Sequence, residues 1–109
     1  MKKYLYFVEK IQKINAQYGL THHEIALLDF SARRYFANES ITVGELILQR
    51  GLASQATLHK TFKFLLDKKL LATQHHETDG RIKQVILTKL ALERCKNLDR
   101  IMNKALKPN

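Results

Sequence analysis

The spacing of apolar residues changes once along this chain, and that change constrains the fold more than any other feature. Apolar residues recur at helical spacing up to about residue 68 and again from Lys89 onward. Between these stretches, the runs Leu70–Glu77 and Ile82–Thr88 are rich in β-branched and apolar side chains. The one proline is Pro108, so no proline interrupts the helical stretches before it. The spacing therefore predicts a mostly α fold with one β element.

Capping sequences mark the ends of the first two helices. We expect one helix over about residues 2–18, ended by Gly19. A second should begin at the capping box of residues 21–24, Thr-His-His-Glu, and run to about Asn38. Its expected inward residues are Ile25, Leu28, Ala32 and Tyr35 or Phe36.

The next two helices lie close together in the sequence. Residues 42–45, Thr-Val-Gly-Glu, form a second capping box and open a short third helix, which Gly51 should close. Ser54 can cap a fourth helix over about residues 55–68. The expected inward residues are Val43, Leu46 and Ile47 in the third helix, and Leu58, Phe62 and Leu65 in the fourth. A short helix, a tight turn and an amphipathic helix predict a helix-turn-helix.

Asp79-Gly80 lies between the two strand-like runs and predicts a β-hairpin. This dipeptide is typical of a type I′ turn, in which both central residues need positive φ. A hairpin directly after a helix-turn-helix is a wing. We therefore expect residues 1–109 to form a single winged helix-turn-helix domain, with its N- and C-terminal helices available for dimerisation.

The protein is strongly basic, and its charged residues are unevenly distributed along the chain. The net charge is +9, and residues 50–109 carry 13 basic and 5 acidic side chains. A charge concentrated in one half suggests a surface that faces a polyanion, and nucleic acid is the commonest such partner. A basic surface that serves only solubility is the alternative.

The sequence also bears on where the protein acts. No apolar run approaches the roughly 18 residues that span a bilayer, and Glu9, Lys10 and Lys13 interrupt the apolar stretch at the N-terminus. We therefore expect a cytoplasmic protein that does not bind membranes. The single cysteine, Cys95, lies in the apolar pattern of the last helix, which favours buried packing over redox sensing.

Four stretches together resemble the MarR-type winged-helix transcription regulators: Ser54–Lys60, Leu65–Leu71, Asp79–Arg81 and Val85–Thr88. The resemblance covers about residues 41–92. It implies that the first two stretches begin and close the recognition helix, that Asp79 orients Arg81 at the wing tip by a salt bridge, and that Thr88 caps the next helix. The glycine usual in the family after the recognition helix is Lys69 here. A left-handed backbone at Lys69 would cost on the order of 1 kcal/mol.

A recognition helix must present polar and cationic groups on the side opposite its buried face. Side chains near its N-terminus reach base edges, and lysines further along more often bind phosphate. In the wing, a guanidinium can enter a narrow minor groove. The expected DNA-binding residues are Ser54, Gln55, Thr57, His59, Lys60, Lys63, Arg81 and Lys83, with Asp79 as the partner of Arg81. A merely solvated helix face and simple turn chemistry are the alternatives for the two groups.

Other kinds of site find little support. The pairs His22-His23 and His75-His76 invite a metal interpretation, but adjacent histidines do not converge on one ion, and one cysteine cannot complete a structural zinc site. The sequence shows no phosphate-binding glycine loop and no grouped nucleophile, base and acid. We therefore expect no metal, no cofactor and no enzymatic activity.

The sequence as a whole favours a sequence-specific regulator of transcription that binds double-stranded DNA. A winged-helix interaction module without sequence-specific DNA binding is the alternative, and an RNA-binding winged helix is a third possibility. A homodimer is expected through apolar stripes on the two terminal helices: Tyr4, Phe7, Val8, Ile11 and Ile14 on the first, and Leu98, Ile101, Met102 and Leu106 on the last. The alternative is that these stripes cover only their own domain. The sequence does not identify a small-molecule effector.

Overall fold

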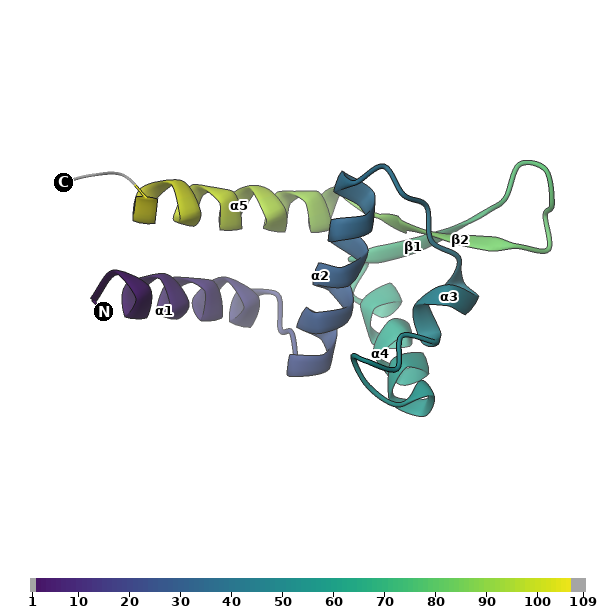
Figure 1. Ribbon diagram of the computed structural model, residues 1–109, viewed down its shortest axis with the longest axis horizontal. Coiled ribbons are helices and arrows are strands. Elements are labelled where there is room, and N and C mark those ends of the chain that lie inside the picture. Colours follow the sequence, from purple (N-terminus) through teal and green to yellow (C-terminus); the bar gives the residue numbers. More distant parts are fainter. Residues whose placement is uncertain (1, 107–109) are drawn as a thin grey trace.

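The computed structural model describes residues 2–106 and confirms the mostly α fold with one hairpin. The elements are α1 (Lys2–Gln17), α2 (His22–Phe36), α3 (Val43–Ile47), α4 (Gln55–Asp67), β1 (Leu71–His75), β2 (Lys83–Leu87) and α5 (Lys89–Leu106). Helices α2, α3 and α4 and the hairpin form a body, and α1 and α5 lie side by side as an arm that extends from it (Figure 1). The molecule is accordingly elongated, at 53 × 26 × 23 Å. No helix in this part of the chain is long and apolar enough to cross a membrane.

The hydrophobic core lies in the body. Leu27 and Leu28 of α2 form one buried cluster with Leu58 and Leu65 of α4. Burying a leucine side chain stabilises the fold by about 1.5–3 kcal/mol, so this cluster fixes how α4 lies on α2. The predicted inward residues that are buried are Leu28, Ala32, Leu46, Leu58, Phe62 and Leu65, and Ile25, Val43 and Ile47 are half-buried.

The prediction that Tyr35 or Phe36 is buried was wrong. Tyr35 is 47% exposed and Phe36 is 62% exposed. The last buried residue of α2 is Ala32, so the core ends one turn before the helix does. The two rings instead pack edge to face on each other, with their centres 5.1 Å apart.

The helix starts follow the predicted caps. In both capping boxes the threonine hydroxyl accepts the N–H of the glutamate three residues later, and the glutamate accepts the threonine N–H. Helix α3, however, ends at Ile47, and the prediction that Gly51 closes it was wrong. Turn hydrogen bonds from Leu48 to Leu52 replace the helix; one runs from the N–H of Leu52 to the carbonyl of Gln49, at 2.9 Å.

The hairpin is present, but its turn is not type I′. Strands β1 and β2 pair antiparallel from Leu71 opposite Leu87 to His75 opposite Lys83. Neither Asp79 nor Gly80 has a positive φ. The Asp79 carboxylate accepts the Arg81 N–H at 3.1 Å, and the Asp79 carbonyl accepts the Ile82 N–H at 3.0 Å. These bonds stabilise a turn over residues 79–82 that needs no left-handed residue.

Lys69 closes α4 in a left-handed conformation, with a φ of 60°. Its N–H donates to the carbonyl of Leu66 and the N–H of Leu70 donates to that of Leu65, both at 3.0 Å. These two bonds form a Schellman motif, which normally places glycine at this position. The motif turns the chain so that Leu70, 1% exposed, enters the core directly after the helix.

We predict that Lys69→Gly raises the free energy of unfolding by roughly 0.5–1 kcal/mol. A left-handed side-chain residue costs about 1–2 kcal/mol, and the greater entropy of glycine in the unfolded chain offsets part of that gain. Urea denaturation measures the change. Lys69→Ala is the matched control, because it keeps the Cβ that causes the backbone strain and removes the rest of the side chain with its charge. Equal stabilisation by both variants would assign the effect to charge and contradict the backbone explanation.

Candidate nucleic-acid interface

The outer face of α4 carries a set of exposed polar side chains. Lys60 and Lys63 are exposed on the side opposite the buried Leu58, Phe62 and Leu65, and His59 is exposed at the edge of that side. Gln55 is exposed at the first position of the helix. The ammonium of Lys60 lies 5.8 Å from the centre of the Phe64 ring, which is 44% exposed. This cation–π contact partly compensates for the exposure of the Phe64 ring.

Ser54 and Thr57 are arranged differently from the lysines. The Ser54 hydroxyl accepts the N–H of Thr57 at 3.2 Å and donates to the Thr57 hydroxyl at 3.0 Å. Ser54 therefore caps α4 as predicted. Thr57 is half-buried and its hydroxyl is already bonded, so it is less available than Gln55 to an external ligand.

The other end of α4 is fixed by a buried carboxylate. Lys68 donates to Oε2 of Glu24 and to the carbonyl of Gly19, both at 2.6 Å, and the Glu24 side chain is 1% exposed. Burial by itself raises the pKa of Glu24, but hydrogen bonds from Lys68 and Thr21 outweigh it and hold that pKa below its usual value. The charged pair therefore connects the first turn of α2 with the C-terminus of α4.

The wing tip presents one arginine in a defined orientation. Nε of Arg81 lies 3.1 Å from Oδ1 of Asp79, and Nη2 lies 3.2 Å from Oδ2, so the salt bridge that the resemblance implies is present. This side-chain bond, with the backbone N–H of Arg81, holds the pKa of Asp79 below its usual value. The Arg81 side chain remains 91% exposed.

The rest of the wing is held by histidines and by the body. Nδ1 of His75 lies 2.7 Å from the Gly80 carbonyl, and Nδ1 of His76 accepts the Thr78 N–H at 3.2 Å. The N–H of Val85 donates to the carbonyl of Ile41 at 2.9 Å, which joins β2 to the segment before α3. The wing is therefore anchored to the helix-turn-helix at its base.

Comparison with known proteins relates this architecture to regulators of transcription. The sequence matches no family model and no curated protein. The structure is similar to that of MepR from Staphylococcus aureus in its complex with DNA, with a TM-score of 0.68 and 18% identity over 88% of this chain and 75% of that one. It is also similar to a transcriptional regulator from Thermotoga maritima (TM-score 0.68, 20% identity, 91% of this chain and 67% of that one). A MarR-like transcription regulator from Bacillus cereus gives a TM-score of 0.61 and 19% identity over 97% of this chain and 73% of that one. The chain has the MarR-type winged-helix fold.

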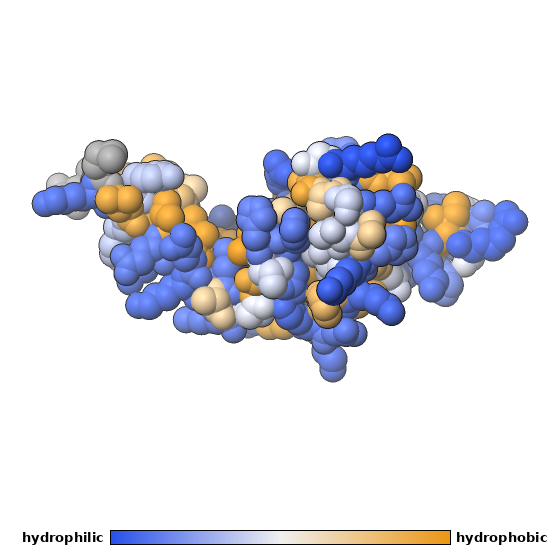
Figure 2. Space-filling model, turned by 90° about the horizontal axis from the view of Figure 1, so that it is seen from below, coloured by the Kyte–Doolittle hydropathy of each residue, from blue (hydrophilic) through white to orange (hydrophobic). Residues whose placement is uncertain are grey.

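Within the MarR-type fold, the predicted residues fall into two groups, in which Thr57 and Asp79 are half-buried and the others are exposed. The first group lies on α4 and its N-cap, and Asp79, Arg81 and Lys83 lie on the wing. Thr88 caps α5 by accepting the N–H of Ala91 at 3.2 Å, as the resemblance implies. Viewed from below, apolar residues follow the arm, and smaller apolar patches lie among the hydrophilic residues of the body and wing (Figure 2).

Two residues of this region were not among the candidates predicted from the sequence. Arg50 is exposed in the turn between α3 and α4, five residues before α4 begins. Its only sequence signal is a basic residue inside the turn. Lys68, which joins Glu24, is recognisable only once α2 and α4 are seen together.

The other groups considered from the sequence do not assemble into a site. Within residues 2–106, no group of three or more histidine, cysteine, aspartate or glutamate side chains could hold a metal ion. Cys95 is half-buried, and burial raises the pKa of its thiol, which keeps it protonated.

Proposed function

We propose that this protein is a non-enzymatic regulator of transcription that binds double-stranded DNA in a sequence-specific way, with α4 in the major groove and the wing against the adjacent minor groove. The observation that carries this proposal is the exposed polar surface of α4, because a helix that packs on the body by one side presents Lys60 and Lys63 on the other. His59, at the edge of that side, and Gln55, at the first position of the helix, are exposed as well. The same fold in MepR, whose crystal structure contains DNA, supports the proposal.

The residue types on this face suit different parts of a duplex. The amide of Gln55, at the first position of α4, has the donor and acceptor that adenine requires. His59 lies one turn further on and can donate or accept. Lys60, Lys63 and Arg50 are cations with long flexible chains, which suits phosphate rather than base edges.

We predict that Lys60→Ala and Lys63→Ala weaken binding to all duplexes about equally and each lower the salt slope by about one. Gln55→Ala should instead reduce discrimination between sequences, by about 1–3 kcal/mol at one base pair. Fluorescence anisotropy at several salt concentrations, on duplexes first selected from a random library, measures both effects. Lys96→Ala is the control and should leave affinity unchanged, because Lys96 is an exposed lysine in the middle of α5, away from α4 and from the far end of the arm.

The same experiment separates the proposal from its alternatives. A winged-helix interaction module would show no salt-dependent affinity for duplex DNA and would select no sequence. Stronger competition by duplex RNA than by duplex DNA would indicate the RNA-binding alternative.

The wing supplies an independent prediction. Arg81→Ala should lower affinity by about tenfold, or about 1.4 kcal/mol, most strongly on sites with A·T-rich flanks, without changing the thermal unfolding midpoint. Asp79→Ala should also lower affinity, although it removes a negative charge beside DNA, because Arg81 loses its orientation. Higher affinity in Asp79→Ala would mean that only net charge matters at the wing. Unchanged affinity in both variants would place the wing away from the duplex.

We further propose a homodimer formed through the arm. Much of each predicted stripe packs between α1 and α5, since Phe7, Val8, Ile11, Ile14, Leu98 and Ile101 are half-buried. Apolar side chains nevertheless remain on the outside of the arm: Tyr4, Leu5, Tyr6, Met102 and Leu106, which are 42–74% exposed. A twofold dimer would bury them and place two recognition helices about 34 Å apart, which matches one turn of DNA.

We predict that sedimentation equilibrium at micromolar concentration gives twice the 12.7 kDa of one chain. Tyr4→Lys and Met102→Lys should each weaken dimerisation at least about tenfold, because they place a charge in an apolar interface. Leu48→Lys is the matched control, because Leu48 is an exposed apolar residue outside the arm, at 52%. A wild-type mass near that of one chain would contradict the dimer, and dimers that survive both arm substitutions would contradict this interface.

A further inference from the structure

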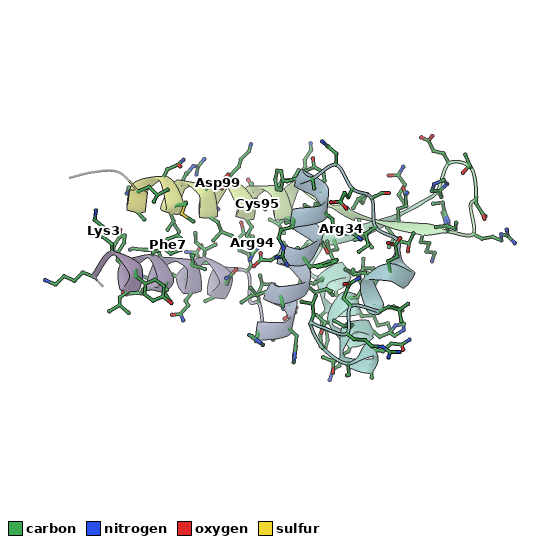
Figure 3. All side chains as sticks on the ribbon, in the orientation of Figure 1. Lys3, Phe7, Arg34, Arg94, Cys95 and Asp99 are labelled. Atoms are coloured by element: carbon green, nitrogen blue, oxygen red, sulfur yellow. The ribbon has the colours of Figure 1, made fainter. Side chains whose placement is uncertain are left out.

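The arm meets the body at a buried arginine. Arg94 lies in the second turn of α5 and is 1% exposed. Its Nε donates to Oδ1 of Asn15 in α1 at 2.9 Å, and Nη1 donates to Oδ1 of Asp29 in α2 at 2.9 Å. Figure 3 shows Arg94 where α1, α2 and α5 come together. One side chain therefore joins both helices of the arm to the body.

A contribution to stability does not by itself explain why an arginine occupies this position. Removing a guanidinium from water is costly, and a well-packed apolar side chain often stabilises a core equally well. The Asp29 side chain is 50% exposed, which weakens the attraction of this ion pair further. The planar guanidinium does offer donors in fixed directions, so it defines the relative orientation of the helices that it bonds.

Other connections between arm and body lie at the ends of the helices. Helix α5 is joined to the body through Thr88, whose hydroxyl donates to the Lys69 carbonyl at 2.7 Å, and through the buried Ala91. Helix α1 continues into the turn that holds Tyr18 and Leu20 against the core. Beyond these points, α1 and α5 pack on each other, so a hinge at this level would move the arm as a unit (Figure 1).

A small change of angle here has a large effect at the far end of the arm. Helix α5 runs a further twelve residues from Arg94 to Leu106, which is about 18 Å at 1.5 Å per residue. A rotation of about 10° would move that end by about 3 Å. This displacement is close to the rise of one DNA base pair, about 3.4 Å.

We propose that Arg94 is a positioning residue that fixes the angle between arm and body and thereby sets the half-site spacing that the dimer reads. The inference rests on the proposed function, because it requires a dimer that binds DNA through the arm and α4. Arg94 itself lies away from the α4 face and has no contact with DNA in this arrangement. It acts on spacing, and the sequence of each half-site is read by α4.

The test is selection of bound duplexes from a random library by wild type, Arg94→Met and Asp29→Asn. Methionine keeps an apolar stem without the directed donors, and Asp29→Asn changes only a half-exposed acceptor, so it preserves folding even where Arg94→Met does not. Thermal unfolding followed by circular dichroism establishes that each variant is folded. Arg100→Met is the matched control, since Arg100 is an exposed arginine on the same helix.

Wild type and Arg100→Met should select inverted repeats with a single spacing. Arg94→Met and, to a lesser degree, Asp29→Asn should select the same half-site sequence at spacings spread by one base pair or more, with at least a fivefold smaller preference for the wild-type spacing. If wild type selects one spacing and both variants keep it, the inference is overturned and the proposed function stands. If wild type selects no inverted repeat, the proposed dimeric function is overturned, and the inference with it.

Discussion

The packing of α4 on α2 is the contact on which the rest of this structure depends. Leu27 and Leu28 on one helix and Leu58 and Leu65 on the other are almost completely removed from water. Burial on this scale provides the main stabilisation of the body, and it also leaves only one face of α4 free. The core therefore determines which face of α4 is exposed to solvent, and that face carries the polar side chains.

Helix α2 links the core to both ends of the molecule. Near its start, Glu24 accepts a hydrogen bond from Lys68 and so fixes the C-terminus of α4. One and a half turns later, Asp29 accepts a hydrogen bond from Arg94 of the arm. Because both carboxylates belong to one rigid helix, the orientations of the arm and of α4 are both defined relative to α2.

The sequence predicted most of the candidate interface for a simple reason. Positions on an amphipathic helix are assigned to its inner or outer face by spacing alone, so the burial of Leu58 and the exposure of Lys60 and Lys63 required no tertiary information. Spacing places Gln55 on the side of Leu58, and it is exposed at the first position of α4, before the buried residues begin. Spacing was insufficient at Tyr35, which lies on the apolar side of α2 but beyond the end of the core. Spacing also did not predict that the Thr57 hydroxyl would accept a hydrogen bond from Ser54, the N-cap of α4.

The sequence by itself determined the order of the elements, the caps of α2, α3 and α4, the position of the hairpin and the outward face of α4. Each of these depends on residues only a few positions apart, whose backbone and side-chain preferences act locally. Only the tertiary structure decided the partners of Glu24 and Arg94, because Lys68 is 44 residues from Glu24 and Asn15 is 79 residues from Arg94. A charged residue is buried when distant segments bring it a partner of opposite or complementary character, and no local pattern records which segments those will be.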